Sequence, residues 1–325
     1  MQSKQVWMNG RLVPAEQATV PFLNTGLHYG LAVFEGIRAY RTARGPAVFR
    51  LREHVERLLH SAHVLAMRAI PWSEAEIVAA VREVVAANGF DDCYVRPLIY
   101  LSEGGWNLDV GNGKASLGIA VWEWGPYLGA EAREAGVRAN VSSFTRHHPN
   151  VMMTKAKIAG NYANSALAKT ESVRLGFDEA IMLDPSGFVA ECTGENLFLV
   201  RDAALVTTPT ATILEGITRD SILTLARDLG HEVHEAPVSR DQLYLADEVF
   251  VCGTAAEVVA LREIDGRKVG SGRVGPFTRS LQQAFHAAVR GENARYERWL
   301  TYVRDAPAER ADLATPLPST SRASS

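Results

Sequence analysis

The sequence predicts an α+β fold built from two α/β domains, with the smaller domain first. A length of 325 residues corresponds to about two domains and is enough to bury a large core. Segments with helical periodicity alternate with short strand-like segments along most of the chain. A polar stretch separates an earlier group of these segments from a later group. We therefore expect a first domain over residues 1–126, a connector over 127–136 and a larger second domain over 137–305.

The composition is that of an ordinary globular protein, with 47% hydrophobic and 22% charged residues. A formal net charge of −3 gives no electrostatic reason to expect nucleic acid or an anionic membrane as a partner. The N-terminus has no apolar core of signal-peptide length, and no apolar run is long enough to span a bilayer. The cysteines Cys93, Cys192 and Cys252 stand far apart, so we expect reduced core residues in a cytoplasmic protein.

The first domain is expected to begin with a β-hairpin followed by a helix. The pair Asn9-Gly10 lies between the strand-like residues 6–8 and 11–13, and this pair is a strong signal for a two-residue turn. A helix is expected from about residue 51, because apolar residues recur there with helical spacing. These residues are Leu51, Val55, Leu58, Leu59, Ala62 and Ala66.

A second helix is expected to begin after Ser73. Glu76 lies three residues later and completes a capping box, and residues 88–89, Asn-Gly, end the helix. Two strands follow, joined by a segment rich in glycine and asparagine that we expect to be a mobile loop. The strands are predicted over residues 94–101 and 117–124, and the loop over 102–115.

The second domain is expected to contain strands in alternation with helices. Helices are predicted over about residues 161–175 and 218–229, and Gly230 ends the later one. The tail over residues 306–325 has only isolated leucines as large apolar residues, so we expect it to be disordered. Strands are predicted over residues 137–144, 179–183, 196–200 and 248–252.

Two lysines, Lys155 and Lys157, precede the helix predicted near residue 161. Lysine catalysis on a carbonyl cofactor needs an amine with a lowered pKa, which small apolar neighbours favour. On an extended segment the two side chains lie on one face, so their spacing does not choose between them. Taken alone, each is more often a surface charge.

Two acids in the segment ECTGENLF, residues 191–198, lie next to a predicted strand. A carboxylate against the pyridine nitrogen of pyridoxal phosphate holds that nitrogen protonated and makes the ring an electron sink. Glu191 and Glu195 both fit this role from the local sequence. A solvated strand edge is the ordinary alternative for either residue.

Two further segments are candidates for binding a phosphate. Gly216, Ile217 and Thr218 lie at the predicted start of a helix, where main-chain amides and the helix dipole favour an anion. The small residues of 253–257 follow a buried strand and leave amides accessible. Arg57 lies off the apolar stripe of the first long helix. Each of these features also occurs without any ligand.

Tyr94 and Arg96 share one face of a predicted strand, because side chains alternate along it. A phenol and a guanidinium on one face can bind a carboxylate, or can simply line an exposed sheet. The chain has no P-loop, GxGxxG, HExxH or nucleophile-elbow motif. His147 and His148 are adjacent, and the side chains of adjacent residues rarely bind the same ion, so we expect no metal.

Nine segments, in order along the chain, together resemble the branched-chain amino acid aminotransferases, which are fold-type IV enzymes. Among them are LHYGLAVFEGIRAY, KIAGNYANS and ECTGENLF. Residues 104–115 and 144–150 do not match the family pattern, so the breadth of substrates stays open. The nine segments cover residues 7–10, 27–40, 48–58, 94–98, 122–132, 157–165, 191–198, 214–222 and 243–258.

The resemblance implies that pyridoxal 5′-phosphate is the cofactor and that Lys157 is the Schiff-base lysine, because Lys157 lies five residues before Tyr162. The resemblance also implies that Tyr162 forms a hydrogen bond with the phenolic oxygen of the cofactor. Glu191 is implied at the pyridine nitrogen, with Glu195 as its neighbour. The residues implied to bind the phosphate are Arg57, Ile217, Thr218 and Thr254.

The same resemblance implies a substrate site beside the cofactor. The α-carboxylate of the substrate is expected on Tyr94 and on the amides of Thr254 and Ala255. Arg96 can bind the γ-carboxylate of glutamate, and Tyr29 is expected to come from the partner of a homodimer. The side-chain pocket is expected to be lined by Phe34, Gly36, Trp124 and Tyr127.

The implied activity is transamination between L-leucine, L-isoleucine or L-valine and 2-oxoglutarate. The implied partners are small amino acids, 2-keto acids and further copies of the chain, in a homodimer at least or in a higher homo-oligomer. The implied fold places the cofactor between the two domains. Alternatives within the fold type are a D-amino acid or (R)-amine aminotransferase and an aminodeoxychorismate lyase. A non-catalytic protein that has kept the fold is the alternative from another class.

Overall fold

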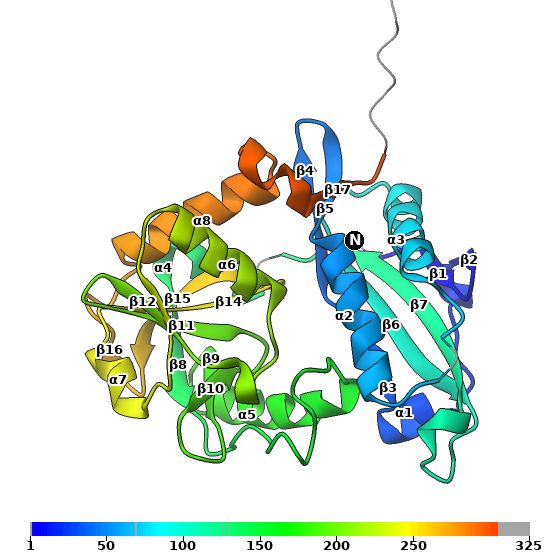
Figure 1. The fold of residues 1–325 in the computed structure, drawn as a ribbon, viewed down its shortest axis with the longest axis horizontal. Coiled ribbons are helices and arrows are strands. Elements are labelled where there is room, and N and C mark those ends of the chain that lie inside the picture. The colour runs from blue at the N-terminus through cyan, green and yellow to red at the C-terminus, as the bar shows by residue number, and fades with distance from the viewer. Residues whose placement is uncertain (1, 69, 126, 130, 305–325) are drawn as a thin grey trace, which may run out of the picture.

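The computed structural model describes residues 2–68, 70–125, 127–129 and 131–304. Two β-sheets with their helices lie side by side, and the chain passes from helix α8 (Pro276–Val289) beside the second sheet to strand β17 (Leu300–Tyr302) in the first (Figure 1). The predicted tail over residues 306–325 lies outside the described residues. The chain therefore has the predicted α+β class, with two α/β halves.

The first sheet has the order β17-β5-β4-β6-β7-β1-β2, and β3 pairs with β6. Every pair in it is antiparallel. Its strands are β1 (Gln5–Met8), β2 (Arg11–Pro14), β3 (Ala32–Phe34), β4 (Ile37–Thr42), β5 (Gly45–Phe49), β6 (Cys93–Glu103), β7 (Lys114–Trp122) and β17 (Leu300–Tyr302). Its helices are α1 (Thr25–Tyr29), α2 (Leu51–Val64) and α3 (Glu74–Asn88).

The second sheet has the order β10-β9-β8-β15-β14-β11-β12-β13, and β16 pairs with β15. It is mixed, because β8 runs parallel to both β9 and β15. Its strands are β8 (Val137–Val141), β9 (Glu179–Leu183), β10 (Val189–Cys192), β11 (Asn196–Arg201), β12 (Ala204–Thr207), β13 (Val233–Glu235), β14 (Glu248–Gly253), β15 (Glu257–Ile264) and β16 (Arg267–Lys268). Its helices are α4 (Ala132–Ala135), α5 (Tyr162–Arg174), α6 (Ile217–Asp228), α7 (Arg240–Leu245) and α8 (Pro276–Val289).

The local signals in the sequence correspond to real turns and caps. Asn9 and Gly10 have φ angles of 49° and 103°, as a tight hairpin turn between β1 and β2 requires. Ser73 and Glu76 form the predicted capping box at the start of α3. Gly89 ends that helix in the left-handed conformation with φ 71°. The predicted hairpin and the predicted start and end of this helix are confirmed.

Several boundaries differ from the prediction. Strands β6 and β7 extend into the predicted loop over residues 102–115, and Ser116 donates a hydrogen bond to Ser102 across them at 2.8 Å. The loop is therefore shorter than its glycine content suggested, and its mobility stays a prediction. Strand β8 ends at Val141 rather than at residue 144. The predicted connector over residues 127–136 contains the one-turn helix α4.

Strand β17 pairs with β5, so the end of the predicted second domain returns to the first sheet. Phe49 on β5 packs against Phe285 on α8 and against Trp299, with ring centroids 5.5 Å and 5.8 Å apart. These contacts belong to a buried cluster with residues from both sheets. The cluster joins the two halves and fixes the space between them, although the exact division into domains stays a prediction.

Two findings bear on the exclusions made from the sequence. Cys93, Cys192 and Cys252 are all buried and free, as predicted. No helix in the described ranges combines the length and apolar character that a membrane span needs.

Candidate active site

Two cavities meet where the two halves of the chain face each other. The first has an empty volume of about 590 Å³ and lies on the side of β10, β11 and the start of α6. The second, of about 1120 Å³, lies on the side of β3, β6 and the turn after β14. The wall that the two cavities share consists of Lys157, Tyr162, Gly194, Glu195 and Thr254.

The structure brings almost all of the predicted site residues to these two cavities, although their roles stay predictions. Tyr29 is the exception, because it lines neither cavity and is exposed on α1. The predicted cofactor residues Arg57, Lys157, Tyr162, Glu191, Glu195, Ile217, Thr218 and Thr254 line the first cavity. The predicted substrate residues Phe34, Gly36, Tyr94, Arg96, Trp124, Tyr127, Thr254 and Ala255 line the second.

Lys157 is held by its backbone and points its amine toward a tyrosine. Its amide donates to the hydroxyl of Ser61 on α2 at 2.9 Å, and its carbonyl accepts from the amide of Phe34 at 3.1 Å. Its Nζ donates a hydrogen bond to the hydroxyl of Tyr162 at 2.7 Å. Lys155 lines neither cavity and instead forms an ion pair with Glu215 at 3.1 Å. The geometry therefore favours Lys157, where the spacing left both lysines open.

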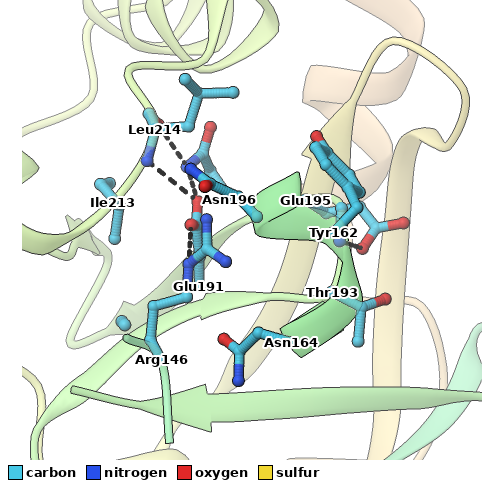
Figure 2. Close-up of polar contacts among 12 residues, drawn as sticks. Arg146, Tyr162, Asn164, Glu191, Thr193, Glu195, Asn196, Ile213 and Leu214 are labelled. Carbon is cyan, nitrogen blue, oxygen red and sulfur yellow. Dashed lines mark hydrogen bonds and ion pairs between the residues drawn. The ribbon is translucent and has the colours of Figure 1, made fainter. Parts of the chain in front are cut away.

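Glu191 on β10 is buried, lines the first cavity and accepts three hydrogen bonds (Figure 2). Arg146 Nε donates at 2.7 Å, the Leu214 amide at 3.2 Å and the Asn196 side chain at 3.4 Å. Burial raises the pKa of Glu191, while the charge of Arg146 acts in the opposite direction. The buried pair presents a carboxylate with a fixed orientation to whatever occupies the cavity.

Arg146 was not predicted from the sequence. It lies in residues 144–150, the segment that matched no pattern, and 45 residues separate it from Glu191. Its amide donates to the Leu183 carbonyl at 2.7 Å, which fixes the segment beside β9. Only this tertiary contact makes Arg146 a partner of the site, so no local signal marked it.

The opposite end of the first cavity is built from a helix start and an arginine. Helix α6 begins at Ile217, and its N-cap Gly216 offers no side chain to the amides of the first turn. A Cβ at Gly216 would lie 2.0 Å from the Asn196 Oδ1, so only glycine fits there. Free amides at a helix N-terminus favour an anion. Arg57 reaches this end from α2 and donates to the Glu215 carbonyl at 2.7 Å.

Arg57 is held by a buried acid that the sequence analysis also missed. Arg57 Nε and Nη2 donate to the two carboxylate oxygens of Glu35 at 2.6 Å and 2.9 Å, and His54 Nδ1 lies 2.7 Å from the same group. Burial acts to raise the pKa of Glu35, but the charges of Arg57 and His54 hold it well below its usual range. The paired carboxylate fixes the guanidinium in one orientation.

The second cavity is lined by aromatic rings and contains one guanidinium. Arg96 Nη2 donates to the hydroxyl of Tyr94 at 2.9 Å, so the predicted shared strand face is confirmed. The guanidinium lies 4.5 Å from the ring centroid of Phe34. Arg96 Nε is buried and has no hydrogen-bond partner within the described residues. A Cβ at Gly36 would lie 2.1 Å from the Tyr94 hydroxyl, so the wall needs glycine there.

The family model for amino-transferase class IV matches residues 32–264. The chain belongs to this family. It is 46% identical over 299 residues to a branched-chain-amino-acid aminotransferase of Pseudomonas aeruginosa, with 92% of this chain and 97% of that protein covered. It is likewise 46% identical over 300 residues to the enzyme of that name from Escherichia coli strain K12, with the same coverage.

Solved structures agree in fold with this class IV chain. A crystal structure of a branched-chain amino acid aminotransferase from T.th. with pyridoxamine 5′-phosphate is 50% identical and has a TM-score of 0.89. The match covers 94% of this chain and 100% of that one. The Escherichia coli branched-chain amino acid aminotransferase is 45% identical with a TM-score of 0.90, over 93% and 100% of the two chains. The predicted fold type and family are confirmed.

Proposed function

We propose that this protein is a pyridoxal 5′-phosphate-dependent aminotransferase acting on branched-chain L-amino acids. It transfers the amino group of leucine, isoleucine or valine to 2-oxoglutarate, giving branched 2-keto acids and L-glutamate. The observation that carries the proposal is the pair of joined cavities with Lys157 in their shared wall. One cavity suits the cofactor. The other is lined by aromatic rings, which suit an apolar substrate, and by one guanidinium, which suits a dicarboxylate.

The residues of the first cavity fit the cofactor at three points. The Glu191 carboxylate, fixed by Arg146, suits a protonated pyridine nitrogen. The uncapped start of α6 and the guanidinium of Arg57 suit a phosphate at the other end. Tyr162 is within hydrogen-bond distance of Lys157 Nζ and suits the phenolic oxygen.

The chemistry divides between the cofactor and the chain. When bound, pyridoxal 5′-phosphate supplies an electron sink for the bond broken at the substrate α-carbon. Lys157 Nζ would hold the cofactor, and once free it would remove the α-proton as a general base and later return a proton as an acid. Glu191 would keep the ring nitrogen protonated.

Substrate recognition follows from the second cavity. The rings of Phe34, Trp124 and Tyr127 offer an apolar surface to an aliphatic side chain. Arg96 lines the same cavity and offers its guanidinium to a second carboxylate, so glutamate and 2-oxoglutarate bind in the same space. Tyr94 and the turn at Thr254 and Ala255 are left for the α-carboxylate.

A donor panel tests this function. Purified protein with the cofactor and 2-oxoglutarate is expected to form glutamate from L-leucine, L-isoleucine and L-valine. Turnover only with D-amino acids or (R)-amines would support an aminotransferase of that kind instead, and pyruvate release from aminodeoxychorismate would support the lyase. A protein that gives no visible cofactor absorbance, or none that changes with L-leucine, would support the non-catalytic alternative.

Arg96→Ala is expected to separate the two half-reactions. The γ-carboxylate of glutamate loses a charge-assisted bond worth about 1.5–3 kcal/mol, so its half-reaction should slow by roughly ten- to a hundredfold. Leucine has no second carboxylate and should lose much less. Single-turnover cofactor absorbance measures both rates. The exposed Arg11→Ala variant is the control. Equal losses for both donors would mean that Arg96 supports the site or binds the α-carboxylate.

We further propose a homodimer located in the cytoplasm. Exposed apolar side chains form one patch, which includes residues just before α1, residues on α1 and residues of the loop between β6 and β7. In this patch Tyr29 packs against Trp106, with their ring centroids 6.0 Å apart. Patches of this kind mark protein interfaces. A second copy covering this patch brings Tyr29 to the partner's substrate cavity. The patch comprises Phe22, Leu23, Leu27, Tyr29, Trp106 and Leu108.

Phe22→Asp tests the dimer, because it buries a charge in the proposed interface. Sedimentation is expected to give twice the chain mass of 35.5 kDa for the unmodified protein and to shift toward the monomer for the variant. Turnover should fall with the dimer fraction, since each site then lacks Tyr29 from its partner. Sedimentation of the unmodified protein at the monomer mass would refute the proposal.

A further inference from the structure

A buried carboxyl group lies in the wall that the two cavities share. Glu195 is only 4% exposed and follows the bend after β10. Its Cγ lies 3.5 Å from where a Cβ on Gly253 of β14 would stand, and the residue lines both cavities. A second carboxyl group, Glu179 on β9, is fully buried and interacts with it electrostatically. The two acids form one buried cluster.

The two carboxyl groups are held very unequally. Glu179 accepts hydrogen bonds from the amide of Ala180 at 2.9 Å and from the amide of Thr193 at 3.2 Å, and also from the Thr193 hydroxyl. Lys169 on α5 forms an ion pair with it. Glu195 accepts one hydrogen bond in the described structure, from the Gly194 amide at 3.1 Å. Hydrogen bonds and a counter-charge favour the ionised form of a carboxyl group, and Glu179 has more of both than Glu195.

Two like charges in one buried cluster cannot both be present at low cost, so the proton lies on Glu195. Burial, and then the charge of Glu179, raise the pKa of Glu195 to about 8. Glu195 is therefore neutral below this pH and negatively charged above it. The change in charge occurs on the wall of the substrate cavity.

Three of the ionisable groups around Glu195 do not produce the same change. Burial holds the pKa values of Cys192, Cys252 and Tyr127 above their ordinary values, so these groups stay neutral near pH 8. Arg96 stays charged. The ionisable groups that face Glu195 or share its cavities are Glu179 on β9, Lys169 and Tyr162 on α5, Glu191 and Cys192 on β10, Cys252 on β14, Tyr94 and Arg96 on β6, Tyr127 after β7, and Lys157.

We propose that Glu195 is a specificity-determining residue that sets the affinity of the site for dicarboxylates relative to monocarboxylates. The inference rests on the proposed function, which requires both kinds of substrate to share one cavity. While Glu195 is neutral, Arg96 is the dominant charge facing the second carboxylate of a dicarboxylate. When Glu195 ionises, it repels a ligand of charge −2 more than one of charge −1. The site then discriminates against the dicarboxylate.

The experiment is a calorimetric titration of the cofactor-loaded protein with glutarate and with 4-methylpentanoate, from about pH 6 to about pH 9. The ratio of the glutarate to the 4-methylpentanoate dissociation constant is expected to rise by about tenfold across pH 8. Ionisations of the cofactor or of Lys157 occur equally in the unmodified protein and in Glu195→Gln, so the difference between these two proteins measures the effect of Glu195. In Glu195→Gln the rise in the ratio should be much smaller, and in Glu83→Gln, an exposed acid on α3, the ratio should rise as in the unmodified protein.

A level ratio in the unmodified protein, or an equal rise in Glu195→Gln, would overturn the inference. If the Gln variant does not fold, proton uptake replaces it as the measurement. Glutarate binding by the unmodified protein near pH 8, compared in two buffers of different ionisation enthalpy, should take up more protons than 4-methylpentanoate binding, and equal uptake would overturn the inference. These binding measurements need no turnover. A failed donor panel therefore refutes the proposed function separately from the role of Glu195.

Discussion

Lys157→Ala is expected to abolish transamination and to remove the visible absorbance of the lysine-bound cofactor. Within the described residues, Lys157 is the lysine that lines the two cavities. The substitution removes both the covalent attachment and the general base, so turnover should fall by at least about a thousandfold. The absorbance spectrum and glutamate formation measure the two losses independently. Added methylamine is expected to restore part of the rate in the variant, because a free amine can enter the space that the side chain leaves.

Lys155→Ala is the matched control, since it removes an amine two residues away. The substitution removes an ion pair with Glu215 and hydrogen bonds to the carbonyls of Thr210 and Ile213. The Lys155 and Glu215 side chains are largely exposed, so the change should cost only about 1–2 kcal/mol. Its absorbance and turnover should stay close to those of the unmodified protein. If Lys155→Ala were inactive and Lys157→Ala active, the assignment of the lysine would be wrong.

The parts of the fold that the sequence predicted are those with a complete local signal. The hairpin turn at Asn9 and Gly10 and the capping box of Ser73 and Glu76 need no residue from elsewhere in the chain. Strand β17 has no such signal, because three residues at the far end of the chain become a strand only by pairing with β5. Strands β3 to β5 and helix α8 were likewise not predicted. Their pairing and packing depend on distant segments.

In the candidate site, too, the contacts that depend on local sequence were predicted and those that depend on distant residues were not. Tyr94 and Arg96 were predicted to share a face because strand alternation is a local property, and their hydrogen bond follows from it. The choice of Lys157 over Lys155 came from the resemblance, because their spacing is ambiguous on an extended segment. Arg146 is a partner of Glu191 only through tertiary structure.

The buried acids that act through other residues were missed for the same reason. Glu35 holds Arg57 from a different element, and Glu179 determines which carboxyl of its cluster carries a proton. His54 and Arg57 lie three residues apart on α2 and so share a face, which is the one local signal for this network. Nothing in the sequence indicates that Glu35 lies against that face.

Glu191→Gln is expected to leave the cofactor bound but to slow turnover by about a hundredfold or more. A neutral amide cannot hold the pyridine nitrogen protonated, so the ring becomes a poor electron sink. The proposed phosphate contacts of α6 and Arg57 and the proposed attachment to Lys157 do not involve Glu191, so the cofactor should stay bound. Glutamate formation and the absorbance of the bound cofactor measure the two properties.

The free energy of unfolding and the variant Glu195→Gln distinguish this role from a structural one. The substitution leaves Arg146 without its charged partner, and breaking a buried pair costs about 3–5 kcal/mol, so the free energy of unfolding should also fall. Rates must therefore be compared at a temperature where the variant is fully folded. Glu195→Gln is the matched change four residues on, and it should lower turnover far less because Glu195 is already neutral near pH 7. Turnover of Glu191→Gln within a factor of about two of the unmodified protein, less than about 0.5 kcal/mol in the activation free energy, would reassign the nitrogen contact to Glu195.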